Sequence, residues 1–406
     1  MRLQFVHFRL AMLSLFISFL FISCGEKSSN LVSNTKIPVL LDRNEKLRNG
    51  KEWDDVMNSY QKLKLAIQKN DDDQESKIRL AQLFIREARV TGEHGHYYNA
   101  ALNMTDQILN SKSKNRDMDF LALVTKAGVQ LSHHDFNGAL ITGKKAVVIN
   151  PNNPQIFGVL VDANVELGNY SEAVKMADIM IAMKPDLRSY ARISYIREIH
   201  GEVDQAFEAM KMAVEAGIPG YEDTAWAMLT LADMYKLYGQ YDKAESIYKE
   251  ILAQRQDYPF AIAALGSIYM KKGDMALAEK MTKDAIAIIP EVSFYTQLAE
   301  IYQKQGNTQA IDPLMNEIFA MMKNDEESGH NMNLEYAHIY LDLMNDNDKA
   351  LEYAQKEYLK RPENIDVNRM LARIYAADKN KSMVGKYLAA ATATHSKHPE
   401  LIALHI

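Results

Sequence analysis

The fold of this chain is decided by residues 225–258, AWAMLTLADMYKLYGQYDKAESIYKEILAQRQDY, and by residues 259–290, PFAIAALGSIYMKKGDMALAEKMTKDAIAIIP. The two segments are copies of one unit, because each key position of the first recurs 34 residues later in the second. The equivalent pairs are Leu231 and Leu265, Ala232 and Gly266, Tyr235 and Tyr269, Gly239 and Gly273, Tyr241 and Met275, Ala244 and Ala278, and Tyr248 and Thr282. Apolar residues at helical spacing on either side of the glycine predict two amphipathic helices joined by a tight turn. One such pair cannot cover its own apolar face, so the units must stack.

This pattern resembles the tetratricopeptide repeat. The resemblance consists of the 34-residue period, a small residue after a leucine, an aromatic three residues on, a glycine at the bend and an alanine five beyond it. It implies an all-α fold, an α-solenoid of stacked helix-turn-helix units forming a right-handed superhelix. About nine units can be placed in the sequence, with starts near Gln74, Phe120, Pro154, Leu187, Ala225, Pro259, Val292, Asn331 and Ile365.

The N-terminal sequence predicts a targeting signal. Arg2 and Arg9 precede an apolar run over residues 10–22, and the only cysteine of the chain, Cys24, follows. The run is shorter than the roughly 20 residues that a membrane-spanning helix needs. It resembles a bacterial lipoprotein signal, which implies that Cys24 is acylated and becomes the mature N-terminus. An ordinary secretory signal with an incidental cysteine, or an N-terminal membrane anchor, are the alternatives. Gly25 resembles the residue found in lipoproteins sent to the outer membrane, so we expect that location in the cell envelope.

The sequence divides into five segments. We expect a signal peptide over residues 1–23, a flexible tether over residues 24–50 and an N-terminal capping helix with its linker over residues 51–73. The repeats occupy residues 74–399, and residues 400–406 begin a C-terminal capping segment. The tether is expected because its sequence is polar and lacks helical periodicity.

Composition excludes several classes of function. The formal net charge of −6 and the absence of a basic stripe argue against a nucleic-acid-binding groove, which needs lysines and arginines to neutralise phosphates. Acylation of Cys24 would leave no thiol for a disulfide or a thiolate metal site. No catalytic motif stands out, and we expect neither catalysis nor a cofactor. The segment Gly138 to Lys145 matches the skeleton of a phosphate-binding loop, but it lacks the Ser or Thr that binds magnesium and lies in the second helix of a unit.

Two histidine pairs raise the question of a metal site. His94 and His96 lie in one helix connection, while His133 and His134, followed by Asp135, lie in the next. Turns of adjacent units share one edge of a stack, so these groups could converge on a divalent metal. Their spacing is not a known ligand signature, and exposed turns are polar in any case. We therefore predict no metal site.

The resemblance also implies a binding surface, a concave groove lined by the first helix of each unit. The positions of this sequence that match the family's groove positions are Asp162, Glu166, Arg188, Tyr195, Glu198, Trp226, Asp233, Lys236, Phe260, Met270, Lys271, Arg369 and Arg373. Aromatic residues with flanking charges are what a peptide-binding hot spot needs. The clamp for a peptide's terminal carboxylates is not expected, because Leu229 and Asp233 stand where that clamp needs Lys and Asn.

We therefore expect a lipid-anchored, non-catalytic scaffold or adaptor that binds envelope proteins or peptides. The alternative is a lipoprotein that binds nutrients or glycans. Regular repeats and only two tryptophans, Trp53 and Trp226, favour the scaffold. Quenching of Trp226 fluorescence by oligosaccharides would favour the alternative.

Overall fold

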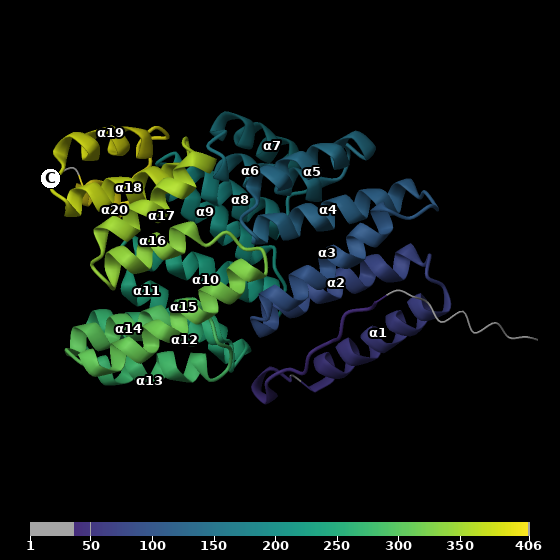
Figure 1. Ribbon diagram of the computed structural model, residues 1–406, viewed down its shortest axis with the longest axis horizontal. Helices are drawn as coiled ribbons and strands as arrows, with labels where there is room; N and C mark the ends of the chain where they lie inside the picture. Colours follow the sequence, from purple (N-terminus) through teal and green to yellow (C-terminus); the bar gives the residue numbers. More distant parts are fainter. Residues whose placement is uncertain (1–35, 49, 405–406) are drawn as a thin grey trace, which may run out of the picture.

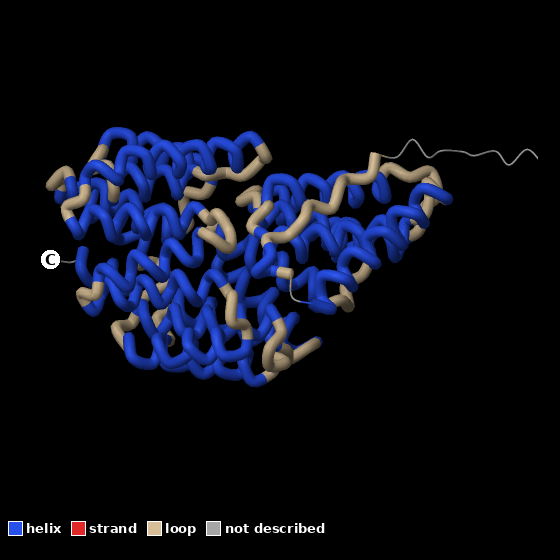
Figure 2. The backbone as a smooth tube through the Cα atoms, turned by 90° about the horizontal axis from the view of Figure 1, so that it is seen from below, coloured by secondary structure: helices blue, strands red, loops and turns tan. Residues whose placement is uncertain are grey.

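The computed structural model describes residues 36–48 and 50–404, and this part of the chain is helical without strands (Figure 2). The predicted signal peptide and Cys24 lie outside it. No helix among the described residues has the length and apolarity needed to cross a membrane. Two short 3-10 helices cover Glu45–Leu47 and Thr308–Ala310. The α-helices are α1 Gly50–Lys69, α2 Gln74–Thr91, α3 His94–Leu109, α4 Arg116–Ser132, α5 Phe136–Ile149, α6 Pro154–Glu166, α7 Tyr170–Met183, α8 Leu187–Ile199, α9 Val203–Glu215, α10 Glu222–Leu237, α11 Tyr241–Gln254, α12 Pro259–Lys272, α13 Met275–Ile286, α14 Val292–Gln305, α15 Ile311–Glu327, α16 Asn333–Asp342, α17 Asn347–Lys360, α18 Ile365–Ala377, α19 Lys381–Ala391 and α20 Pro399–Leu404.

Helices α2 to α19 form nine antiparallel pairs that stack one after another. We number the pairs as units 1 to 9, from α2 with α3 to α18 with α19. In each unit a hairpin turn joins the first helix to the second, and a connector leads to the next unit. The prediction of an all-α solenoid is confirmed.

Each described hairpin turn contains one residue with positive φ. Glycine fills this position in six units, because it adopts the left-handed conformation without strain. The six are Gly92, Gly168, Gly201, Gly239, Gly273 and Gly306. In the other three units the position is held by His134, Asn345 and Lys379. The repeat therefore keeps one backbone geometry even where its glycine is replaced.

The core is a chain of clusters rather than one centre. Small side chains let the helices of a unit approach closely, and Ala232 and Ala244 are fully buried between α10 and α11. Tyr235 fills the space between units 4 and 5, where its ring stacks on Phe207 with centroids 4.6 Å apart. Each unit thus buries its apolar face on its neighbours, as the sequence predicts.

Unit 7 departs from the regular pattern. A 3-10 turn precedes α15, which begins at Ile311 and holds Pro313 in its first turn, where proline is tolerated. Residues 323–330 are expected to be a polar connector, but α15 continues to Glu327. Met322, near the end of this helix, is fully buried in the same core cluster as Ile318. The connector between α15 and α16 is therefore limited to residues 328–332.

Residues 36–48 pack against the solenoid, so the expected flexible tether over residues 24–50 is wrong for this part. We call these residues the strap (Figure 2). The Leu41 amide donates to the Tyr97 hydroxyl at 3.0 Å, and the Asn44 side chain donates to the carbonyl of Ala287 at 3.0 Å. Arg43 is buried at 3% exposure. The strap therefore joins unit 1 to the connector after unit 6.

The solenoid closes on itself, because its second superhelical turn lies against the first (Figure 1). The Asn331 amide donates to the carbonyl of His133 at 3.0 Å, and the Ile365 amide donates to the Tyr170 hydroxyl at 2.8 Å. Contacts of this kind join residues 195 to 198 positions apart. The hairpin turns of units 1 to 4 thus meet the connectors six units further along. We call this line of contacts the seam.

Candidate functional site

The first helices turn one side toward the interior of the superhelix, which we call the inner face. The negative charges of Asp366 on α18 and Glu166 on α6 both contribute to raising the pKa of Tyr195 on α8, although α18 belongs to the other superhelical turn. Tyr195 is 38% exposed, yet surrounding protein desolvates it and raises its pKa well above the ordinary value. The inner face is therefore a confined surface that water still reaches.

Most of the charged residues predicted for the groove form ion pairs within the chain. Arg192 binds Asp162 through two hydrogen bonds, of 2.6 and 2.8 Å, which tie unit 4 to unit 3. The remaining pairs are Arg188 with Asp223, Lys236 with Asp233, Arg369 with Asp366 and Glu400, Arg373 with Asp342, and Glu166 with Arg361. Glu198 accepts a hydrogen bond from Tyr238 at 3.4 Å. The pairs of Asp162, Arg188 and Arg373 join neighbouring units and that of Glu166 crosses the seam, whereas Lys236–Asp233 and Arg369–Asp366 lie within one helix.

Two apolar residues of the predicted set contribute to the core. Phe260 packs on Phe294 with ring centroids 5.6 Å apart, and Met270 is buried beside Ile301. A residue that is buried between units cannot contact a partner without repacking. The burial of Met270 argues against its contact with a partner, whereas Phe260 is only partly buried and stays a predicted groove residue.

Three residues of the predicted set remain open. Trp226 on α10 is 44% exposed, and Tyr195 lies on the preceding first helix. The exposed Lys271, at the end of α12, forms no ion pair with a described residue. Trp226 and Tyr195 are thus large exposed aromatic side chains on adjacent first helices, and folding does not explain their exposure.

Arg361 is the centre of a buried network that the sequence did not reveal. Its guanidinium bonds Glu357 at 2.6 Å and also contacts Glu166, and it lies 4.8 Å from the centroid of the Phe136 ring. A polar cavity of about 190 Å³ adjoins the network. Burial raises the pKa of Glu166, while the Arg361 charge opposes that rise. The paired carboxylates make this a structural part of the seam.

The two histidine pairs, His94 with His96 and His133 with His134, do not converge in the way that the sequence suggested. His94 and His133 do converge, but their third neighbour is His330 from the other superhelical turn. The ring centroids of His133 and His330 are 4.4 Å apart, and those of His94 and His330 are 6.4 Å apart. His96 instead bonds the strap carbonyl of Val39, and His134 bonds the carbonyl of Asn331.

His94, His133 and His330 form a cluster of imidazoles in the seam, and the Glu291 carboxylate lies 3.1 Å from Nε2 of His94. One ring nitrogen on each of His94, His133 and His330 is buried without a hydrogen-bond partner among the described residues. Among the described residues, no group of three or more histidine, cysteine, aspartate or glutamate side chains could hold a metal ion. The Tyr98 ring touches all three imidazoles.

The cluster predicts a loss of stability in mild acid. Burial and the charges of neighbouring histidines lower the pKa of His330 to about 4 from 6.5, and the pKa of His133 is lowered for the same reasons. Between pH 6.5 and 4 the unfolded chain therefore binds protons that the folded chain excludes. The free energy of unfolding consequently decreases as the pH is lowered through this range. His94 acts oppositely, since burial would lower its pKa but Glu291 and Asp325 raise it.

Urea unfolding at pH 7 and pH 5 tests this expectation. His330→Asn should lose less stability between the two pH values than the parent chain, because one titrating group is gone. His395→Asn is the matched control, since asparagine tolerates the left-handed backbone of His395 and that residue lies outside the cluster. Equal losses in the parent and in His330→Asn would contradict the account.

Comparison with known proteins supports the repeat. Residues 261–291 match the family model of the tetratricopeptide repeat. A comparison with curated protein sequences finds no match.

Solved structures of low sequence identity share the helical architecture. The Cut9–Hcn1 hetero-tetramer of the APC/C is 16% identical, covers 87% of this chain and 65% of its own, and has a TM-score of 0.43. PilW, a widely conserved type IV pilus biogenesis factor, is 18% identical and has a TM-score of 0.40. The match covers 50% of this chain and 93% of PilW. Human IFIT1 with m7Gppp-AAAA is 12% identical, covers 86% and 88%, and has a TM-score of 0.49. The chain is an all-α solenoid that carries a tetratricopeptide repeat.

Proposed function

We propose that this chain is a non-catalytic scaffold that binds a protein partner through the inner face of its first helices. The observation that carries the proposal is the exposure of Trp226 and Tyr195 on adjacent first helices, while most of the charges around them are paired internally. Aromatic residues of this kind supply much of the binding energy of protein interfaces. A partner that covers them gains apolar contact without having to break the ion pairs between repeats.

A double substitution tests the inner face. Trp226→Ala with Tyr195→Ala should weaken binding of a partner, identified by crosslinking in cells and then purified, by at least about tenfold, because each truncated hot-spot residue costs about 1–2 kcal/mol. Tyr221→Ala is the control, since Tyr221 is 64% exposed but precedes α10. Unchanged affinity in the double variant, measured by calorimetry, would refute the inner face as the binding surface.

We further propose that the scaffold is a lipoprotein of the bacterial cell envelope, held on the outer membrane through Cys24. Its support is the sequence, in which a positively charged start and an apolar run precede the single cysteine. Acyl chains contribute about 0.8 kcal/mol per buried CH₂ group, so several of them hold a protein stably on a bilayer.

Cys24→Ser tests the anchor. The variant should move from the membrane fraction to the soluble fraction after lysis and should no longer incorporate labelled palmitate. A parent chain that incorporates no palmitate would contradict the proposed anchor, whatever its fractionation.

A further inference from the structure

The hairpin turn of unit 5 repeats that of unit 3. Gly168-Asn169-Tyr170 in unit 3 corresponds to Gly239-Gln240-Tyr241 in unit 5. The two glycines have φ values of +79° and +77°, and each tyrosine is the first residue of a second helix. The same residues therefore stand on the same backbone at both turns.

In unit 3 this arrangement holds the backbone turn over residues 362–364 and the first amide of α18. The Tyr170 hydroxyl accepts a hydrogen bond from the Ile365 amide at 2.8 Å and lies 3.4 Å from the carbonyl oxygen of Glu363, to which it can donate. The missing side chain of Gly168 leaves room for the same segment, because a Cβ there would lie 2.5 Å from Cβ of Glu363. A left-handed glycine and a tyrosine two residues later thus form a small receptor for a peptide backbone.

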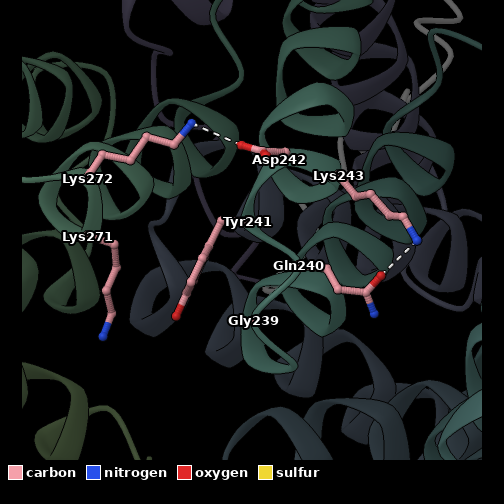
Figure 3. A pocket seen from close by; sticks show the side chains of 7 residues that line it. All are labelled: Gly239, Gln240, Tyr241, Asp242, Lys243, Lys271 and Lys272. Carbon is pink, nitrogen blue, oxygen red and sulfur yellow. Dashed lines mark hydrogen bonds and ion pairs between the residues drawn. The ribbon is translucent and has the colours of Figure 1, made fainter.

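In unit 5 the equivalent receptor faces a cavity. A Cβ on Gly239 would have no atom within 4 Å, and the Tyr241 hydroxyl makes no hydrogen bond with a described residue. The cavity of about 420 Å³ is lined by the turns of units 5 and 6 (Figure 3). The seam explains this difference. The connector over residues 392–398 reaches unit 4, and no described connector lies six units beyond unit 5.

The open receptor is cationic. Lys243, Lys271 and Lys272 line the cavity. Lys272 is paired with Asp242 and Glu245, and Lys243 donates to Gln240 at 2.7 Å. The Lys271 ammonium has no such partner among the described residues, and in Figure 3 its side chain points the same way as the Tyr241 ring.

We propose that the cavity between the hairpin turn of unit 5 and the end of α12 binds an acidic backbone turn of a partner protein. The Tyr241 hydroxyl bonds its backbone, Gly239 gives it room, and Lys271 binds a carboxylate. A connector from a second copy is a poorer occupant, because the acidic connector at residues 362–364 is already held by Tyr170 within its own chain. The proposal rests on the scaffold function but places this contact at the hairpin turn of unit 5, on residues other than Trp226 and Tyr195.

Binding of a defined peptide tests the proposal. The probe is Pro-Glu-Asn-Ile-Asp-Val, the sequence of residues 362–367 that Tyr170 holds inside the chain, with a fluorescent label at its C-terminus. We expect saturable binding to the full chain, measured as anisotropy at low ionic strength. Tyr241→Phe should weaken binding about fivefold, the effect of one hydrogen bond, and Lys271→Glu should weaken it more. Lys280→Glu, which alters an exposed lysine on α13, is the matched control.

Each outcome decides the proposal. A peptide whose two acids are replaced by lysine should not bind. Absence of saturable binding, or binding indifferent to both Tyr241→Phe and Lys271→Glu, would overturn it. Concentration-dependent dimerisation that Lys271→Glu abolishes would assign the cavity to a second copy and overturn the peptide assignment. The double variant Trp226→Ala, Tyr195→Ala should bind the probe normally, so failure of the inner-face proposal can be told from failure of this one.

Discussion

Replacing Arg43 with methionine is expected to lower the free energy of unfolding by about 3–5 kcal/mol, because it leaves a buried carboxylate without its counter-charge. The guanidinium of Arg43 bonds both carboxylate oxygens of Glu87, at 2.7 and 2.8 Å, and Glu87 is fully buried. It also bonds the carbonyl of Leu47 and lies 5.2 Å from the centroid of the Trp53 ring. The substitution should therefore free the strap, and the Leu41 amide should exchange hydrogen faster.

Two further variants separate the pair from its surroundings. Removing both charges, with Arg43→Met and Glu87→Met together, should restore most of the lost stability, because apolar residues of similar volume replace buried pairs at little cost. Arg48→Met breaks an ion pair with Asp42 at the surface and a hydrogen bond to the carbonyl of Arg43, and should change stability by only about 1 kcal/mol. An Arg43→Met chain as stable as the Arg48→Met chain in urea would show that the strap is not held by this pair.

The second large effect is expected at the seam, from Gly168→Ala compared with Gly239→Ala. Both substitutions place a Cβ on left-handed backbone, at a cost of about 1–2 kcal/mol. At Gly168 the new atom also meets the main chain of Glu363, 2.6 Å from its carbonyl carbon, whereas at Gly239 it meets nothing. Overpacking of this kind costs about 1–3 kcal/mol. We therefore expect Gly168→Ala to be the more destabilising by about that amount.

Hydrogen exchange locates the damage. In Gly168→Ala the Ile365 amide should lose protection, because its acceptor Tyr170 lies across the opened seam. In Gly239→Ala the same amide should exchange as in the parent chain. Equal exchange at Ile365 in all three proteins would mean that the two superhelical turns are not held together at this point.

The sequence predicts those structural features that recur in each 34-residue unit. The positions of Gly239 and Gly273 locate two hairpin turns, and Ala232 and Ala244 mark where helices meet, because these constraints recur in every unit. The left-handed backbone of His134 can also be predicted, because this residue occupies the glycine position of a turn whose geometry is common to all units.

The sequence does not predict contacts between residues nearly two hundred positions apart. The bond between Asn331 and His133 depends on how far each unit rotates relative to the last, and small errors in that rotation add up over six units. Arg361 and Glu166 look like ordinary helix residues until the second superhelical turn meets the first. The groove positions are limited in the same way, because position within a repeat does not show that Asp162 pairs with Arg192 in the folded chain.

The seam also changes the mechanics of the molecule. A solenoid whose units touch only their neighbours stretches and bends as a spring, and its curvature adapts to what it holds. Here successive coils are bonded to each other, so extension requires hydrogen bonds such as that between Tyr170 and Ile365 to break first. The coil should resist small forces with little extension and then give way abruptly. Such a body presents its surfaces at fixed spacing.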